Sequence, residues 1–212
     1  MNQAVFLDRD GTLSYDTHYL AAPDRLKLYK STIPALSLLQ SHTFKIIVVT
    51  NQSGIARGIF SESTLHSIHQ RLTQLLKKNQ VRLDGIYFCP HHPDQHCDCR
   101  KPKAALFYQA VQEHQLNLSA SFMIGDSVCD IEAGLTIGCQ TILVLTGRGR
   151  QTLQMIRRKK ALPRLPHFIA PHLLAAAQWI ARQKPPVAKA TATAPTPFSP
   201  SLERQNDTPT TV

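Results

Sequence analysis

Short apolar, β-branched runs recur along the chain and predict the strands of a sheet. They are Ala4–Leu7, Phe44–Val49, Gly85–Phe88, Ser121–Ile124 and Thr141–Leu145. Four of the five runs are apolar at nearly every position and do not alternate with polar residues. Strands of this kind are covered on both faces, as in parallel sheets.

Amphipathic helices are predicted between and after these runs. The segments with helical spacing are Ser31–Gln40, Ser61–Asn79, Lys103–Gln115, Cys129–Ile137 and Pro171–Ala181. Pro171 suits the first position of the last helix, where no backbone N–H is needed. Because strands and helices alternate, we expect an α/β fold, a Rossmann-like doubly wound parallel sheet with helices on both faces.

The composition changes near the end of the chain. From Lys184 onward, Pro, Ala, Thr and Ser dominate and large apolar residues are few. Such a segment buries too little surface to offset its ordering entropy. We therefore expect one folded domain over residues 1–183 and a disordered tail over residues 184–212.

Charge is distributed unevenly. The 212-residue chain has 24 Lys and Arg against 14 Asp and Glu. Residues 1–147 hold 13 basic and 12 acidic side chains, whereas residues 148–212 hold 11 and 2. The predicted domain lacks the basic footprint of a nucleic-acid-binding protein. We interpret the basic residues 148–164 as a solvated helix face and loop; attraction to an anionic surface is the alternative.

Nothing in the sequence indicates export or a membrane. There is no apolar run of about 18 residues, which a membrane span needs. The first residues lack the basic start and long apolar stretch of a signal peptide. We therefore expect a soluble, cytoplasmic protein.

Polar side chains follow three of the predicted strands at the point where each strand ends. They are Asp8 and Asp10, then Thr50 and Asn51, then Asp126 and Asp130. In a parallel sheet these strand ends share the edge where ligands bind. Carboxylates gathered there would repel one another without a cation, and Mg²⁺ is the usual oxygen-bound partner of phosphate. For Asp130 alone, a helix N-cap is an equally good interpretation.

A second candidate metal site lies in the segment 89–101. Cys89, His91, Cys97 and Cys99 offer three thiolates and one imidazole, a closed tetrahedral set suited to structural Zn²⁺. His92 and His96 are competing ligands, and a reduced, metal-free loop is the alternative to a zinc site. Cys129 and Cys139 lie in apolar surroundings and are expected to be core residues.

The residues at the strand ends resemble the four motifs of the haloacid-dehalogenase superfamily of phosphohydrolases, over residues 4 to about 147. The matching positions are Asp8-x-Asp10-Gly11-Thr12, the strand that ends in Thr50, Lys101, and Gly125-Asp126-x-x-x-Asp130. The resemblance implies that Asp8 is the nucleophile and Asp10 the general acid and base. Thr50 and Lys101 would hold the phosphoryl oxygens. Mg²⁺ would be bound by Asp8, the Asp10 carbonyl and Asp126, with Asp130 in support.

The spacing leaves no room for a cap domain. The 39 residues between Asp10 and Thr50 already contain a predicted helix. We therefore expect the zinc loop to be the largest lid over the site, and to fix Arg100 and Lys101 directly after its last ligand. An open site of this kind suits a phosphate on a medium-sized metabolite.

Two subfamilies have such a zinc loop, and their substrates are the candidates for this chain. One removes the 7-phosphate of D-glycero-D-manno-heptose 1,7-bisphosphate, a precursor of lipopolysaccharide and other surface glycans. The other acts on histidinol phosphate. The stretch Thr50–Gly58, with Asn51, Gln52 and Ser53, resembles the heptose enzymes.

Further residues fit the heptose subfamily. Asp16 and Tyr19 match a sugar-binding stretch, although His18 stands where that subfamily usually has glycine. Arg100 would bind the distal phosphate because its planar fork suits phosphate. The resemblance thus implies a monomeric enzyme acting on a phosphorylated sugar. Two alternatives remain. The substrate could be histidinol phosphate or another sugar or nucleotide phosphate, or the protein could be a catalytically silent binding protein with the same fold.

Overall fold

The computed structural model describes residues 1–158 and 165–183. Its strands are β1 (Ala4–Leu7), β2 (Lys45–Asn51), β3 (Gly85–Cys89), β4 (Phe122–Gly125), β5 (Gln140–Val144) and β6 (Phe168–Ala170). Its α-helices are α1 (Thr32–Ser41), α2 (Glu62–Lys78), α3 (Ala105–His114), α4 (Val128–Thr136), α5 (Gly149–Arg157) and α6 (Leu173–Gln183). The predicted tail 184–212 lies outside the described residues, so the domain boundary stays a prediction.

The six strands form one sheet in the order β3-β2-β1-β4-β5-β6, and every neighbouring pair is parallel. This is the Rossmann-like order that the alternating pattern predicts, and the fold prediction is confirmed. The chain reverses its direction of growth between β1 and β4. Open α/β sheets bind their ligands beyond the carboxyl ends of the strands at this point.

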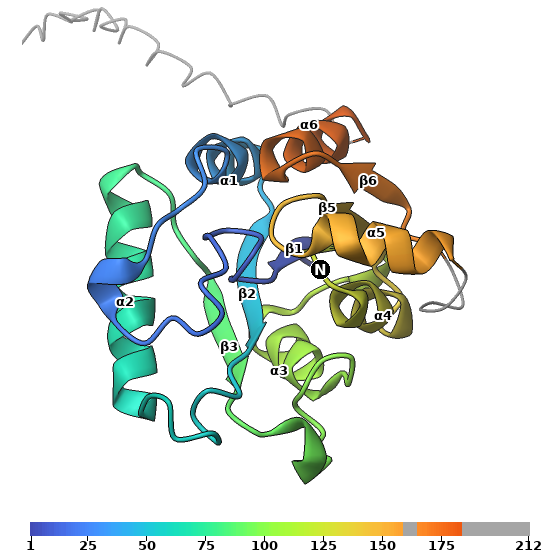
Figure 1. Cartoon of the computed structure of the whole chain (residues 1–212). Helices are drawn as coiled ribbons and strands as arrows, with labels where there is room; N and C mark the ends of the chain where they lie inside the picture. The colour runs from blue at the N-terminus through green and yellow to red at the C-terminus, as the bar shows by residue number, and fades with distance from the viewer. Residues whose placement is uncertain (159–164, 184–212) are drawn as a thin grey trace, which may run out of the picture.

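Helices cover both faces of the sheet (Figure 1). Along β1, Val5 and Leu7 pack in a core with residues of α1, α2 and α6, whereas Ala4 and Phe6 pack in a core with residues of α3 and α4. A smaller cluster joins Leu143 of β5 to α4 and α5. Burial on both faces explains why these strands are apolar at successive positions.

Several boundaries differ from the sequence prediction. Strand β2 continues to Asn51, so Thr50 and Asn51 belong to the strand itself. Strand β6 escapes prediction because it has three residues, of which Ile169 is exposed. Helix α6 begins at Leu173 and not at Pro171, because the His172 side chain accepts a hydrogen bond from the Ala175 backbone N–H and caps the helix.

No helix within the described ranges has both the length and the apolar character that crossing a membrane requires.

Candidate active site

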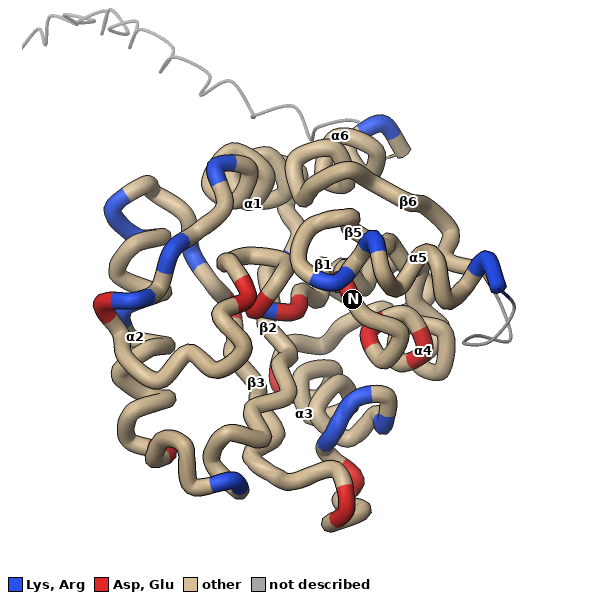
Figure 2. The backbone as a smooth tube through the Cα atoms, viewed as in Figure 1, with Lys and Arg blue, Asp and Glu red and all other residues tan. Residues whose placement is uncertain are grey.

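A cavity of about 390 Å³ lies at the switch point, beyond the carboxyl ends of the strands. Figure 2 shows acidic residues near the centre of this face and most Lys and Arg residues toward its periphery. All ten side chains predicted for catalysis and substrate binding line it: Asp8, Asp10, Asp16, Tyr19, Thr50, Asn51, Gln52, Ser53, Arg100 and Lys101. Asp126 and Asp130 line it too.

Three buried carboxylates converge at the floor of this cavity. Ligand atoms of Asp8, Asp126 and Asp130 lie within 4.8 Å of one another. Burial, together with the repulsion from neighbouring carboxylates, raises the pKa of Asp8 to about 7 although Lys101 opposes the shift. Burial and the charges of Asp8 and Asp130 raise the pKa of Asp126 to about 8. A cation at this position would relieve the repulsion, so the residues fit Mg²⁺.

Gly11 makes room for this cluster. Its φ is +83°, and a Cβ added there would lie 2.1 Å from the Asp126 carboxylate. A side chain at position 11 would therefore displace a carboxylate of the cluster as well as strain the backbone.

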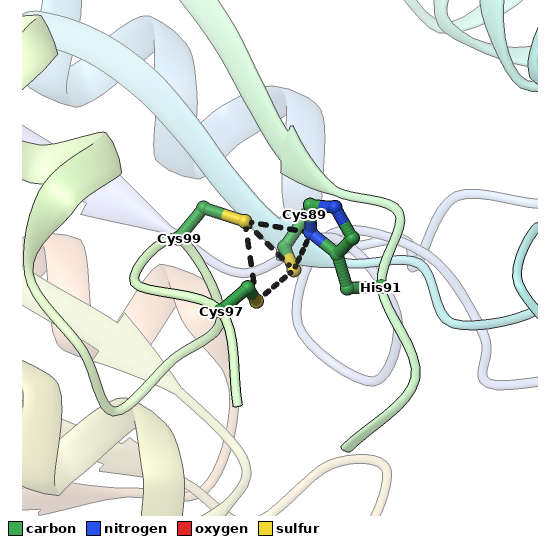
Figure 3. Close-up of side chains that lie close together, drawn as sticks. All are labelled: Cys89, His91, Cys97 and Cys99. Atoms are coloured by element: carbon green, nitrogen blue, oxygen red, sulfur yellow. Dashed lines mark hydrogen bonds between the residues drawn. The ribbon is translucent and has the colours of Figure 1, made fainter. Parts of the chain in front are cut away.

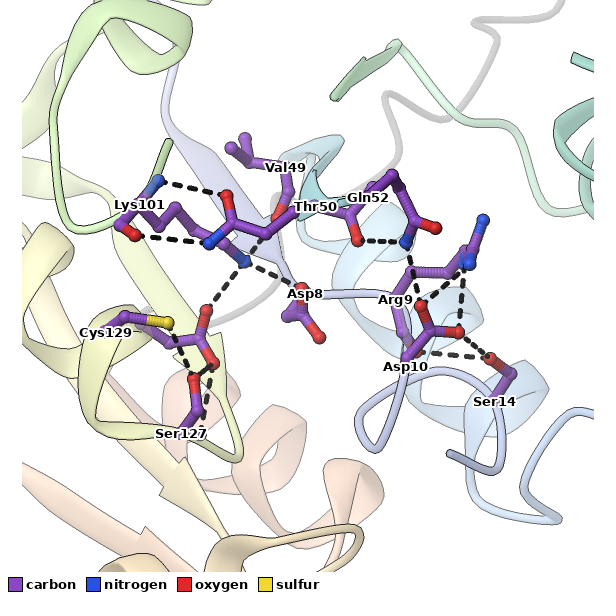
Figure 4. A network of polar contacts seen from close by, with 12 residues as sticks. Asp8, Arg9, Asp10, Ser14, Val49, Thr50, Gln52, Lys101, Ser127 and Cys129 are labelled. Atoms are coloured by element: carbon purple, nitrogen blue, oxygen red, sulfur yellow. Dashed lines mark hydrogen bonds and ion pairs between the residues drawn. The ribbon is translucent and has the colours of Figure 1, made fainter. Parts of the chain in front are cut away.

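Lys101 provides a fixed positive charge beside Asp8 (Figure 4). Its Nζ lies 2.7 Å from Asp8 Oδ1 and 2.6 Å from Asp130 Oδ1, and it donates to the Val49 carbonyl. The lysine is buried, yet the two carboxylates outweigh burial and raise its pKa, so the ammonium stays charged. The Asn51 side chain exchanges two hydrogen bonds with the Lys101 main chain and so fixes the lysine in place.

Asp10 points away from the carboxylate cluster. Its carboxylate receives two hydrogen bonds from Arg9, at 3.1 and 2.7 Å, and one from Gln52 at 2.8 Å. Burial alone would raise the pKa of Asp10, but Arg9 and Gln52 outweigh burial and lower it. Gln52 also donates to Thr50 Oγ1, which leaves the threonine O–H available to a ligand.

Asp130 and Asp126 are each held by backbone groups at the start of a helix. Ser127, the N-cap of α4, donates to Asp130 from both its hydroxyl and its backbone N–H. Asp130 is thus a helix-capping residue and a partner of Lys101 at the same time. Asp126 accepts a hydrogen bond of 2.7 Å from the backbone N–H of Arg148, the residue before α5.

The rim of the cavity carries three arginines and the predicted sugar-binding residues. Arg57, Arg100 and Arg148 all line it. Arg100 Nη1 is buried and, within the described residues, makes no hydrogen bond. Arg148 Nε lies 3.3 Å from Asp16 Oδ2. Within residues 1–158 and 165–183 these guanidinium groups are unpaired or weakly paired, which suits them to a second phosphate.

His18 adopts the backbone conformation that a glycine would favour. Its φ is +71°, and its N–H donates to Asp16 Oδ1. The replacement of glycine at this position therefore leaves the left-handed turn in place and adds an imidazole to the cavity wall.

The predicted zinc ligands form a tight cluster at the end of β3 (Figure 3). Cys99 Sγ lies 3.1 Å from both Cys89 Sγ and His91 Nδ1, and 3.4 Å from Cys97 Sγ. Ligands about 2.3 Å from a tetrahedral zinc are about 3.8 Å apart, so a small expansion would admit the ion. All five cysteines are free thiols. Burial opposes ionisation of Cys97, but hydrogen bonds from the neighbouring thiols lower its pKa to about 7.

The competing histidines lie outside this cluster. The His92 side chain caps a short 3-10 turn, and His96 ends that turn in a left-handed conformation. Neither belongs to the four residues whose ligand atoms converge.

Sequence reasoning missed Arg57, Arg148 and Cys129 as cavity residues. The charge pattern assigns Arg148 to the solvated basic stretch 148–164. It follows β5 directly, however, and the end of β5 lies on the same sheet edge as Asp8 and Asp126. The rule applied to the other strands would have placed it here.

Known proteins resemble this chain over most of its length. A model of the HAD-hydrolase-like family matches residues 98–176. The chain is 42% identical over 155 residues to a D-glycero-beta-D-manno-heptose-1,7-bisphosphate 7-phosphatase from Haemophilus influenzae, covering 70% of this chain and 84% of that protein. A protein of the same name from Pseudomonas putida is 38% identical over 151 residues, covering 71% of this chain and 86% of its own length.

A solved structure supports the same relationship. A D,D-heptose 1,7-bisphosphate phosphatase from B. bronchiseptica, complexed with magnesium and phosphate, superposes with a TM-score of 0.78 at 31% identity. The match covers 85% of this chain and 99% of that one. The family resemblance drawn from the strand-end motifs is therefore confirmed. The chain belongs to the haloacid-dehalogenase-like phosphatases.

Proposed function

We propose that this protein removes the 7-phosphate of D-glycero-beta-D-manno-heptose 1,7-bisphosphate through an aspartyl-phosphate at Asp8. The observation that carries the proposal is the placement of Asp8, which lies 2.7 Å from the buried Lys101 ammonium within a three-carboxylate cluster. The substrate and its β anomer are suggested by the names of the relatives.

The reaction divides into two displacements. Asp8 attacks the phosphorus, and the bond from phosphorus to the sugar oxygen breaks. Asp10 donates a proton to that departing oxygen, and then removes one from the water that hydrolyses the aspartyl-phosphate. Lys101 and the Thr50 hydroxyl stabilise the charge on the transferring phosphoryl oxygens.

Asp8, the Asp10 carbonyl and Asp126 would hold Mg²⁺, with Asp130 orienting the site. When bound, the metal would neutralise part of the charge on the phosphoryl group. The solved relative with magnesium and phosphate supports this assignment. Zn²⁺ would be held by Cys89, His91, Cys97 and Cys99 and would stiffen the loop that carries Arg100 and Lys101.

The rim supports a substrate with two phosphates. Arg100, which the sequence suggests for the distal phosphate, offers a buried N–H without a partner in the described part of the chain. Arg148 and Arg57 add charge nearby, and Asp16 and Tyr19 offer polar atoms for sugar hydroxyls. A monophosphate such as histidinol phosphate would leave the outer arginines unused.

We further propose a cytoplasmic monomer. Four thiol and imidazole ligands that converge without any disulfide are suited to a reducing compartment.

A substrate panel tests the proposal. Phosphate release with Mg²⁺ would be measured for the α and β anomers of heptose 1,7-bisphosphate, histidinol phosphate, fructose 1,6-bisphosphate and an aryl phosphate. We expect kcat/KM for the β anomer to exceed every other value by at least about a hundredfold. Uniformly low kcat/KM values across the panel would contradict the proposed substrate. A preference for histidinol phosphate would identify that compound as the substrate instead.

Mg²⁺ binding should strengthen as pH rises. The raised pKa values of Asp8 and Asp126 mean that the metal-free fold favours their protonated forms. Their contribution to stability is present below the ordinary carboxyl pKa and is lost as pH rises through about 7 to 8. At low pH the metal must displace protons. We expect the Kd for Mg²⁺ to be at least about tenfold larger at pH 5.5 than at pH 8.5.

Isothermal titration at the two pH values measures this effect. The control is Asp126→Asn, which removes one of the titrating carboxylates and should flatten the pH dependence as well as weaken binding. Equal Mg²⁺ affinity at both pH values in the unmodified protein would contradict the prediction.

A further inference from the structure

Arg9, the residue between the two aspartates of the first motif, is completely buried. Its side chain points toward Asp10 and not into the cluster around Asp8 (Figure 4). Nε and Nη2 donate to the two oxygens of the Asp10 carboxylate, at 3.1 and 2.7 Å. Two of the three short hydrogen bonds to Asp10 therefore depend on the orientation of one planar guanidinium group, and the third comes from Gln52.

The guanidinium is oriented from its other side by a histidine of α2. Arg9 Nη1 lies 3.2 Å from His69 Nε2. Arginine can only donate, so Nε2 must accept, and the imidazole is therefore neutral with its proton on Nδ1. His69 is itself buried, with its ring edge-on to Phe88 at 5.8 Å between centroids. Packing thus fixes the acceptor in place.

This arrangement restricts the orientation of the Asp10 carboxylate. Two edges of the guanidinium are occupied, one by His69 and one by Asp10, and a planar group held at two edges cannot rotate. Without His69 Nε2 as acceptor, the buried Nη1–H of the charged Arg9 would lose its hydrogen-bond partner. Arg9 would then reorient, and the Asp10 carboxylate would lose its alignment.

We propose that His69 is a positioning residue, which acts through Arg9 to align Asp10 for proton transfer to the leaving oxygen. The inference rests on the role of Asp10 in the proposed function. His69 is not among the residues that line the active-site cavity. It lies outside the four family motifs, 60 positions after Arg9 along the chain.

Two substrates with different leaving groups can distinguish a misplaced Asp10 from a general loss of stability. An alkyl alcohol needs a proton as it departs, whereas 4-nitrophenolate does not. The value of kcat/KM reports the steps up to the first irreversible one, here the transfer of the phosphoryl group to Asp8. Misalignment of Asp10 should therefore lower kcat/KM for an alkyl phosphate and leave that for 4-nitrophenyl phosphate nearly unchanged.

The experiment uses the full chain with Mg²⁺, the best alkyl phosphate of the panel and 4-nitrophenyl phosphate. The variants are His69→Leu, His69→Asn and His69→Gln. Only the glutamine amide oxygen reaches the position of Nε2; the asparagine is one methylene too short. Asp10→Asn is the reference for loss of the proton donor. His66→Leu, at an exposed position one turn earlier on α2, is the matched control.

We expect His69→Leu and His69→Asn to lower kcat/KM for the alkyl phosphate at least about tenfold, with less than about a twofold change for 4-nitrophenyl phosphate. His69→Gln should recover to within about threefold, and His66→Leu should match the unmodified protein. Thermal melting checks folding. If His69→Leu does not fold, the Asn and Gln pair, which differ by one methylene, still decides the question.

The possible outcomes distinguish the role of Asp10 from the role of His69. Equal losses on both substrates in Asp10→Asn would overturn the role of Asp10 in the proposed function. If Asp10→Asn loses kcat/KM mainly on the alkyl phosphate while His69→Leu and His69→Asn do not, the role of Asp10 stands and only the inference about His69 is overturned. The inference would also be overturned if His69→Leu lost kcat/KM only on the alkyl phosphate and His69→Gln lost it equally. The hydrogen-bond acceptor at the position of Nε2 would then not explain the effect.

Discussion

Asp8→Asn is expected to fold normally and to lose at least about a thousandfold in turnover, because an amide cannot accept the phosphoryl group. The fold should survive because the substitution removes one charge from a buried cluster whose members repel one another. Without Mg²⁺, the melting temperature should be equal to or above that of the unmodified protein near pH 8.

The measurement is direct detection of the intermediate. Acid quench during turnover, followed by mass spectrometry, should find phosphate on the peptide that contains Asp8 in the unmodified protein and none in the variant. Asp24→Asn, an exposed carboxylate in the short turn Pro23–Arg25, is the matched control and should keep full activity. Turnover by Asp8→Asn, or phosphate on another residue, would contradict the assignment.

Cys99→Ser is expected to abolish stoichiometric zinc binding and to lower kcat/KM at least about tenfold. The ligand is followed directly by Arg100 and Lys101, so release of the loop would misplace two cations of the site. Loss of a structural zinc also removes binding energy of several kcal/mol from the folded state, so the melting temperature should fall by several degrees.

Metal analysis, melting curves and kinetics on the same preparation test this prediction. The matched control is His96→Asn, in the same loop, because asparagine tolerates the left-handed conformation of that position. It should keep one zinc and full activity. Zinc retained by Cys99→Ser, or lost by His96→Asn, would show that the ligand set differs from the one proposed.

The sequence predicts the central part of this fold well. Strands β1, β2, β4 and β5 bury both faces, so their apolar runs are unambiguous. Strand β6 has three residues and one exposed position, so its pattern is too short to identify. Helix α5 has a strongly polar outer face, and its apolar contacts are few, which is why only a solvated face was expected there.

The candidate site was predictable to the extent that its residues follow strands. Asp8, Asp126 and Thr50 lie at strand ends, and the rule for parallel sheets brings them together. The partners of Asp10 were not predictable, because the approach of His69 to Arg9 depends on how α2 packs on the sheet. The assignment of Asn51 to the substrate also missed its contact with the Lys101 backbone, which is a tertiary contact across 50 residues.

Arg148 influences the site through two separate parts of the same residue. Its main-chain N–H fixes Asp126, and its side chain reaches Asp16 on the rim. Every residue except proline keeps this backbone donor, whatever its side chain. Substitutions at this codon can therefore change which molecules the rim accepts while the carboxylate cluster keeps its geometry. Position 148 is thus a point at which selection can alter substrate preference without first disabling catalysis.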